Sequence, residues 1–237
     1  YNWSPWIYPS QNGYDGILME QLALFEKQHG IKTEAVVRNN WKRCQVDVEN
    51  GHTDMILGAN NTPKRQKTFH SLAIPAFLNK SRMAAYTLAS NTHISVINSL
   101  EDLSQYKLAT DRGNSYGNKI DLFIESLPLE KRRASNTRQD VFKMVIAKRK
   151  DYFFNQEISL LANIEKYSQF ISRIKDVDFK KIYTIEREVP VHMLFSRKTD
   201  AFDTFGSLWI KTINDYYKIT QLKERIAYHK NRANNLQ

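Results

Sequence analysis

One stretch near residue 60 most constrains how this chain can fold. The apolar run at residues 55–57 is typical of a buried strand. Thr62 follows as a good helix N-cap, and Pro63 suits the first helical position. The backbone N–H groups that begin such a helix point back toward the strand end, where they attract anions. Arg65, in the first turn, can add a bidentate fork for a carboxylate or a phosphate.

These residues alone leave two interpretations open. In the first, the strand-to-helix turn holds the acidic end of a small molecule through Arg65. In the second, the turn is the start of a capped surface helix whose arginine is only solvated. Short motifs of this kind occur often by chance, so the residues themselves do not choose between the two.

The order of predicted elements indicates an α/β protein. In the first third of the chain we expect helices at about 15–29, capped by Asp15 and ended by Gly30, and at about 41–49, with strands at 33–37 and 54–57. Short connections between alternating strands and helices are typical of a parallel sheet. After an irregular stretch at 68–80, a second set of strands is expected at 83–88, 107–110, 152–154 and 189–195, with helices around 120–124, 141–145, 158–164, 202–216 and 217–228.

Residues 112–117 repeat the arrangement found near residue 60. They form a small polar loop that follows one predicted strand and precedes a helix, and this loop contains Asn114 and Ser115. Ligands of parallel sheets bind outside the carboxyl ends of the strands. The sequence therefore predicts two α/β halves that could close on one ligand from opposite sides.

Composition sets wide bounds on function. The 237 residues suffice for one large domain or two small ones, and 41% hydrophobic residues are typical of a globular protein. The net charge is +10, but acids lie close to the two densest basic clusters, 131–133 and 148–150. This pattern favours a solvated surface over nucleic-acid binding. No apolar run approaches the roughly 18 residues of a membrane span. The first residues lack the features of a signal peptide, and a secreted protein whose signal peptide has been removed would lack them too.

Enzyme and metal motifs are not found in the sequence. Cys44 is the only cysteine, which rules out an intrachain disulfide, and its place in a helical pattern favours a small buried hydrophobe over a nucleophile. The six histidines do not pair at ligand spacing. No nucleophile elbow, phosphate-binding loop or dinucleotide fingerprint is present. We therefore predict no metal, no cofactor and no catalytic residues.

Six short motifs, in order and with consistent spacing, together resemble one protein family. Each motif is weak alone, but the set covers nearly the whole chain. They are Trp3-Ser4-Pro5-Trp6, Gly13-Tyr14-Asp15, Asn50-Gly51-His52-Thr53-Asp54, Thr62-Pro63-Lys64-Arg65, Ser99-Leu100-Glu101-Asp102-Leu103 and Asp151-Tyr152-Phe153-Phe154. The chain resembles the bacterial extracellular solute-binding proteins of family 3, the periplasmic amino-acid-binding proteins.

The resemblance implies a fold, a location and a task. It implies a two-lobed α/β fold of the periplasmic-binding-protein type II, or Venus-flytrap, class with two hinge strands. Lobe 1 would hold residues 1–86 and 189–237, and lobe 2 residues 87–188. The protein would be a periplasmic monomer that captures a small carboxylate-bearing ligand between its lobes and delivers it to the membrane permease of an ABC importer.

The resemblance also implies roles for residues. Arg65 would pair with the ligand carboxylate, with polar groups of Asn60 and Thr62 beside it. Asn114 and Ser115 would donate to the same carboxylate from the second lobe.

Trp3 and Trp6 would pack on the apolar part of the ligand. Both tryptophans could instead be core residues; the family favours the ligand wall for Trp3 and leaves Trp6 open.

The sequence departs from the family pattern in three ways. Gln156 stands where amino-acid binders usually place the aspartate that pairs with the ligand ammonium, which removes a charge-assisted bond and argues against an ordinary α-amino acid. Side chains alternate across a strand, so the adjacent Glu157 is expected to point elsewhere. Gly58 replaces a common serine, and no counterpart of the family's first strand precedes Tyr1.

Two other functions remain as alternatives. The same fold serves as the extracellular sensor of membrane signalling receptors. A few relatives catalyse dehydration with a carboxylate as general acid, a part that Gln156 cannot play.

Overall fold

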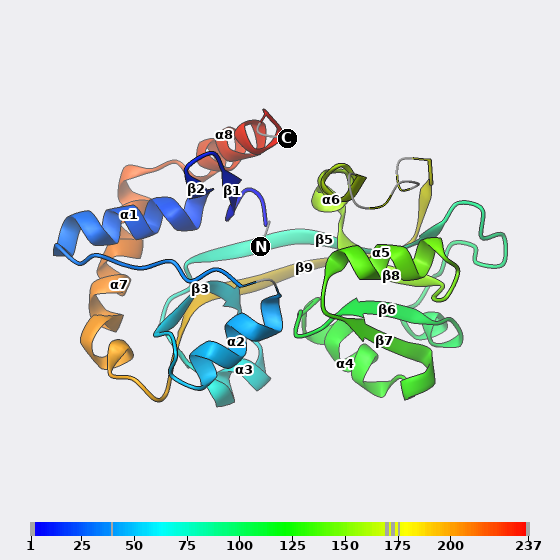
Figure 1. Ribbon diagram of the computed structural model, residues 1–237, viewed down its shortest axis with the longest axis horizontal. Helices are drawn as coiled ribbons and strands as arrows, with labels where there is room; N and C mark the ends of the chain where they lie inside the picture. The colour runs from blue at the N-terminus through cyan, green and yellow to red at the C-terminus, as the bar shows by residue number, and fades with distance from the viewer. Residues whose placement is uncertain (1–2, 39, 169–170, 172–173, 175, 236–237) are drawn as a thin grey trace. The chain divides into compact units, whose positions relative to one another are not determined.

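A computed structural model describes residues 3–38, 40–168, 171, 174 and 176–235. The chain forms two compact units: unit 1 comprises Tyr1–Leu78 and Pro190–Gln237, and unit 2 comprises Asn79–Val189. Two long strands, β5 (Phe77–Leu88) and β9 (Phe179–Phe195), each run from one unit into the other. The predicted mixed α/β class is confirmed (Figure 1). Among the described residues, no helix has both the length and the hydropathy needed to cross a bilayer.

Unit 1 combines a small hairpin with antiparallel pairing on β9. Strands β3 and β4 both pair antiparallel with β9, and β1 pairs antiparallel with β2. The elements of unit 1 besides β9 are β1 (Tyr8–Ser10), β2 (Gly13–Asp15), α1 (Ile17–His29), α2 (Trp41–Glu49), β3 (Met55–Asn60), α3 (Pro63–Thr68), β4 (His70–Ser71), α7 (Ala201–Ile219) and α8 (Leu222–Asn235).

The core of unit 1 forms where α1 packs against α7. Phe25 of α1 stacks on Trp209 of α7 with ring centroids 4.2 Å apart, and both side chains are almost fully buried. Each of these two residues belongs to a row of apolar residues at helical spacing, and these rows predicted both helices. As predicted, Gly30 ends α1 in a left-handed conformation, whereas the N-cap is Gly16 and Asp15 accepts the Gly16 backbone N–H at 2.7 Å.

The strand predicted at residues 33–37 is wrong. The structure has no strand there, and Val36 and Val37 are 42% and 56% exposed. The segment is held at its start by Thr33, whose backbone N–H and hydroxyl both donate to Glu26. Strand propensity is outweighed here because β-branched residues favour a strand only where a neighbouring strand receives them. All pairings described for unit 1 are antiparallel, so the parallel sheet predicted for this half is wrong too.

Unit 2 contains parallel strands, as predicted, although one of them, at residues 132–135, was not predicted. Strand β6 (Leu108–Asp111) pairs parallel with β7 (Arg132–Ser135) on one side and with β8 (Tyr152–Gln156) on the other, while β8 pairs antiparallel with β5. The helical elements of unit 2 are η1 (Glu101–Gln105), α4 (Asn118–Ser126), η2 (Leu129–Lys131), α5 (Arg138–Ile146), η3 (Glu157–Ser159) and α6 (Leu160–Ser168).

Helices α4 and α5 cover opposite faces of this sheet (Figure 1). Tyr152 and Phe154 of β8 pack with residues of α4, whereas Phe153 between them packs with α5. Side chains alternate across a strand, so a strand that is covered on both faces needs a continuous apolar run. This explains the aromatic triplet at 152–154, which the sequence analysis interpreted as a buried strand.

Strand β9 is longer than predicted. It begins at Phe179 rather than near 189, and its first half carries Lys180, Lys181, Glu186 and Arg187. Charged residues interrupt the apolar pattern of this half. Lys181 and Glu186 are exposed while Ile182 is buried, so the sequence offers no continuous apolar run here.

Candidate functional site

The strand-to-helix turn of unit 1 is built as predicted. Strand β3 ends at Asn60, and α3 starts at Pro63 with Thr62 as its N-cap. The Thr62 hydroxyl oxygen accepts the backbone N–H of Arg65 at 3.3 Å. A threonine cap and a proline at the first helical position define the start of this short helix from local chemistry alone.

Arg65 is buried and held in place. The residue is only 6% exposed, and its Nη1 donates to the carbonyl oxygen of Asn60 at 2.8 Å. The guanidinium also lies over the Trp41 ring, 5.5 Å from its centroid, a cation–π arrangement. The interpretation of Arg65 as a merely solvated surface charge is therefore wrong. A cation with a fixed position therefore lies just beyond the carboxyl end of β3.

Asn60 and Thr62 lie beside this cation, as the sequence predicted. Asn60 is 7% exposed and provides the carbonyl that orients Arg65, while Thr62 is half-buried and caps the helix that carries it. The structure thus brings Asn60, Thr62 and Arg65 together in one turn of chain. Their contact with a ligand stays a prediction.

Gly58 explains one departure from the family pattern. Its φ is +133°, a conformation that side chains rarely adopt, at a register irregularity between Ile56 and Ala59 in the pairing with β9. A Cβ at this position would stand 2.7 Å from Cδ1 of Leu18. A serine here would displace the end of the Leu18 side chain and would adopt a φ that side chains rarely adopt, so both packing and backbone conformation favour glycine.

The two N-terminal tryptophans have different environments. Trp6 is 7% exposed and stacks on Phe77, with ring centroids 3.6 Å apart, so it is a core residue of unit 1. Trp3 is half-buried and makes a tilted contact with the same Phe77 at 5.7 Å. This packing leaves Trp3 the more accessible indole, and a ligand contact of either ring stays a prediction.

In unit 2, the loop after β6 is held by Asp121 of α4. The Ser115 hydroxyl donates to Asp121 Oδ2 at 2.5 Å, and the backbone N–H of Tyr116 donates to Asp121 Oδ1 at 2.7 Å. Ser115 is buried and Asn114 half-buried. The Ser115 hydroxyl hydrogen is committed to Asp121, so Ser115 is fixed in place by the helix that follows it.

A buried polar cluster that the sequence analysis missed anchors the same loop. Asp111, the last residue of β6, forms an ion pair with Arg138 Nη2, and the Tyr116 hydroxyl donates to Asp111 Oδ2 at 3.2 Å. Arg138 Nη1 also donates to the carbonyl of Phe154 on β8 at 2.8 Å. Burial raises the pKa of the Asp111 carboxyl, and Arg138 opposes this. In the sequence, only the position of Asp111, an acid at a strand end before a polar loop, indicated this cluster.

Gln156 leaves the sheet at the same edge as that loop. Strand β8 is parallel to β6, with Ala109 opposite Phe153, so the carboxyl ends of both strands meet at one edge. The carbonyl oxygen of Gln156 accepts from Nδ2 of the buried Asn155 at 2.8 Å. Gln156, Asn114 and Ser115 are therefore brought to one side of unit 2.

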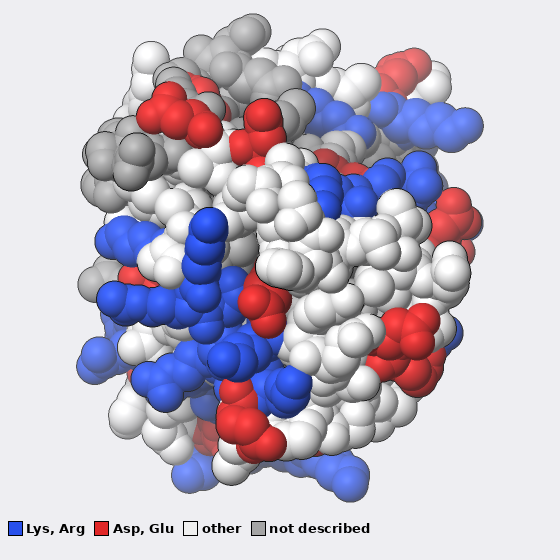
Figure 2. Space-filling view, turned by 90° about the vertical axis from the view of Figure 1, so that its right-hand side faces the viewer, with Lys and Arg blue, Asp and Glu red and all other residues white. Residues whose placement is uncertain are grey.

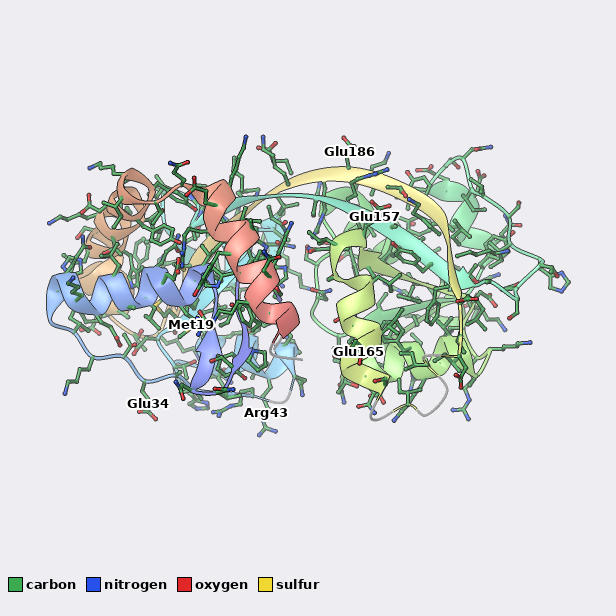
Figure 3. The ribbon with its side chains drawn as sticks, turned by 90° about the horizontal axis from the view of Figure 1, so that it is seen from above. Met19, Glu34, Arg43, Glu157, Glu165 and Glu186 are labelled. Atoms are coloured by element: carbon green, nitrogen blue, oxygen red, sulfur yellow. The ribbon has the colours of Figure 1, made fainter. Side chains whose placement is uncertain are left out.

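Glu157 does not replace the missing acid. Its two carboxylate oxygens form ion pairs with Lys181 Nζ at 2.7 Å and Arg82 Nε at 3.3 Å, on strands β9 and β5 (Figure 3). The charge of Glu157 is thus already matched by two cations of unit 2.

Groups suited to other chemistry are sparse in the described part of the chain. No group of three or more His, Cys, Asp or Glu side chains is placed there to hold a metal ion. Cys44 is half-buried, and burial raises the pKa of its thiol, which disfavours the reactive thiolate.

Solved structures resemble this chain over nearly its full length. A histidine kinase sensor domain with similarity to periplasmic binding proteins matches with a TM-score of 0.71 and 15% identity, covering 97% of this chain and 90% of that chain. The substrate-binding protein of an amino acid ABC transporter matches at 0.67 and 16%, covering 97% and 93%. An ancestral amino acid-binding protein, a precursor of cyclohexadienyl dehydratase, matches at 0.65 and 17%, covering 98% and 91%.

No family model and no curated protein matches the sequence. At these low identities the structural likeness establishes the fold and leaves the task open. The chain therefore has the two-lobed α/β fold of the periplasmic amino-acid-binding proteins, the fold that its six short motifs implied.

Proposed function

We propose that this protein is an extracytoplasmic solute-binding protein of an ABC importer. It captures a small carboxylate-bearing ligand, an amino acid or a related compound, without covalent chemistry and delivers it to a membrane permease. The fold of unit 1 and unit 2, shared with the substrate-binding protein of an amino acid ABC transporter, supports this assignment.

One observation carries the proposal. Arg65 is a buried guanidinium, held by the Asn60 carbonyl and the Trp41 ring where β3 runs into α3. A cation that is desolvated and fixed before binding pairs with a carboxylate without the entropy cost of ordering a flexible side chain. In unit 2, Gln156 offers no charge for an ammonium group, which favours ligands whose acidic end dominates recognition.

The first step of the test is to find the ligand. A thermal-shift screen across amino acids, carboxylic acids and small peptides identifies compounds that raise the unfolding temperature, because a ligand that binds only the folded state stabilises it by mass action.

The second step replaces the cation. We expect Arg65→Gln to weaken binding of the identified acid by at least about thirtyfold, since one partner of a desolvated charged pair is lost. Isothermal titration calorimetry measures this change. Arg43→Gln, which removes an exposed arginine of the same unit, is the matched control and should leave affinity unchanged. Equal affinity in the Arg65 variant and the parent protein would refute the site.

A second candidate function is a sensor domain of a membrane signalling receptor, favoured by the likeness to the histidine kinase sensor domain. Uptake measurements separate the two. Deletion of the gene should abolish import of the identified ligand if the protein serves a transporter, whereas a sensor would leave uptake intact and change a transcriptional response instead.

A dehydratase activity is the third candidate, because one structural neighbour is a precursor of such an enzyme. The neutral Gln156 and the paired Glu157 argue against a general acid at the end of β8. Incubation of the protein with prephenate-like acids, followed by measurement of product, would detect turnover.

A further inference from the structure

The two basic clusters of the sequence meet at one edge of the unit 2 sheet. Strands β7, β6 and β8 are parallel, with Leu108 opposite both Arg132 and Tyr152. The residues that start β7, or directly precede β6 and β8, therefore lie side by side at the amino-terminal edge. The parallel register brings residues 131–133, Lys107 and residues 148–150 together, although they are far apart in the chain.

Lys150 lies close to residues of both neighbouring strands. Lys150 Nζ donates to the carbonyl oxygen of Glu130 at 3.3 Å, next to Lys131 in the chain. Burial lowers the pKa of Lys150, and the positive charges of Lys107 and Arg133 lower it further while Asp151 opposes them. We call this surface the basic edge and define it by Lys107, Lys131, Arg133, Lys148, Arg149 and Lys150.

Arg132 is not part of the basic edge. Its Nη1 donates to the carbonyl of Ile124 on α4 at 2.8 Å, so it points toward the helix that covers the sheet. The neighbouring Arg133 is on the other side of β7 and is exposed. The alternation of side chains along this edge strand thus leaves one of the two arginines for the surface.

The charge of the basic edge is only partly balanced. Its six cations have two acidic neighbours in the chain, Glu130 and Asp151, so these eight residues together carry a net charge of +4. Asp151 Oδ2 already accepts the backbone N–H of Lys107 at 2.7 Å. The space-filling view of this end of unit 2 shows lysine and arginine side chains gathered together, with a few acids among them (Figure 2).

An exposed leucine adjoins the cations. Leu129 is 79% exposed, the highest fraction among the large exposed hydrophobic side chains described, and precedes Glu130, whose carbonyl binds Lys150. Clustered cations beside a protruding aliphatic side chain match the headgroup and upper acyl regions of a lipid surface.

We propose that the basic edge docks unit 2 on the anionic headgroups of a phospholipid bilayer. Lys107, Arg133 and Lys150 contact phosphate groups, and Leu129 enters the interfacial layer. The surface lies at the amino ends of the unit 2 strands, whereas Asn114, Ser115 and Gln156 lie at the carboxyl ends. Lipid docking therefore leaves the candidate ligand-binding residues of unit 2 uncovered, and it stands whether or not the proposed transport function is correct.

Vesicle sedimentation with the full chain tests the proposal. At about 0.1 M salt, the protein should bind vesicles of phosphatidylcholine that contain about a quarter phosphatidylglycerol, and should not bind pure phosphatidylcholine. The triple variant Lys107→Gln/Arg133→Gln/Lys150→Gln should bind the anionic vesicles about a hundredfold more weakly, because three phosphate contacts are removed.

The control separates the basic edge from overall charge. Lys32→Gln/Arg43→Gln/Lys223→Gln removes the same number of charges from exposed positions of unit 1 and should lower binding less than about threefold. Circular dichroism establishes that each variant is folded. Equal losses in the two triple variants, or no binding of the parent protein to anionic vesicles, would overturn the proposal.

The exposed leucine gives an independent check that keeps all charges. Leu129→Ser should weaken vesicle binding several-fold, whereas Ile219→Ser, at a 71% exposed position of unit 1, should not. Soluble poly-glutamate is the competing probe. Binding to poly-glutamate that depends on the basic edge, with no binding to vesicles, would assign the surface to an acidic polypeptide and refute lipid docking.

Discussion

At the scale of single residues, the backbone path from Gly58 to Arg65 sets the direction of the Arg65 side chain. Arg65 is fixed by a backbone carbonyl two residues before its own helix cap, so its direction follows from the path of the chain. Gly58 sets that path, because the register irregularity in β3 needs a backbone conformation that only glycine adopts readily.

Replacement of Gly58 should destabilise unit 1. We expect Gly58→Ala to lower the free energy of unfolding by about 2–3 kcal/mol, because the new Cβ adds a contact with Leu18 to the strain of a positive φ. Urea denaturation measures the change.

Gly13→Ala provides the matched control. Gly13 also has a positive φ, +114°, but a Cβ added there would have no other atom within 4 Å, so this variant introduces only the backbone strain. A smaller loss for Gly13→Ala is expected, and equal losses would show that packing against Leu18 plays no part.

At the scale of elements, helix α8 is attached to unit 1 by a buried polar cluster. His229 is 1% exposed; its Nδ1 accepts the hydroxyl of Tyr8 at 2.8 Å, and its Nε2 lies 3.0 Å from Glu20 Oε1. Arg232 Nε pairs with Asp15 Oδ2 at 2.7 Å, and Arg225 pairs with Glu20. The stripe of three basic side chains on α8 thus meets acids of β2 and α1. The contact between the Tyr8 hydroxyl and Nδ1, together with the burial of the ring, fits a neutral imidazole.

The buried histidine should make stability depend on pH. Burial lowers the pKa of His229 from 6.5 to about 4, with Asp15 raising it and the neighbouring arginines lowering it. Between these values the unfolded chain binds a proton that the folded protein does not. The free energy of unfolding should therefore fall as pH drops from about 6.5 toward 4, by at most about 1.4 kcal/mol per pH unit.

Removing the imidazole tests this assignment. In His229→Gln the slope of unfolding free energy against pH should decrease in that window, measured by urea denaturation at a series of pH values. His52→Gln, at an exposed position, should keep the parent slope. A parent protein whose stability is flat between pH 6.5 and 4 would contradict a buried neutral His229.

At the scale of the whole molecule, each unit has a core of its own. One set of buried residues gathers around α1, α7 and β9, and two others flank the sheet of unit 2. Strands β5 and β9 carry the chain between the units, so the candidate residues of unit 1 and unit 2 are positioned by separate cores. Each set of candidate residues can therefore be altered without disturbing the core that supports the other set.

Ligand binding should raise the stability of the molecule in proportion to its saturation. At a concentration about 100 times the dissociation constant, the identified acid should add about 2.7 kcal/mol to the free energy of unfolding. Thermal unfolding monitored by calorimetry measures this gain. At the same ligand concentration the gain should fall to about 0.9 kcal/mol or less in Arg65→Gln and persist in Arg43→Gln. A gain that stays at the parent value without Arg65 would place the ligand elsewhere.

Much of the fold could be predicted because local chemistry fixes it. The Thr62 cap, Pro63 and the Gly30 stop all occur where the sequence placed them, and the aromatic run at 152–154 forms the doubly covered strand. The strand expected at 33–37 failed for the opposite reason: a strand exists only where a second strand receives it, and no local pattern reports that partner.

The sequence by itself determined the α/β class, the capped turn that carries Arg65 and the buried strands β6 and β8, because caps and hydrophobic periods act over a few residues. Only the tertiary structure decided that Arg65 is buried against Trp41, that Asp111 meets Arg138, and that the cations of 131–133 and 148–150 share one edge. These outcomes join residues distant in the chain, whose contacts depend on how the strands and helices pack.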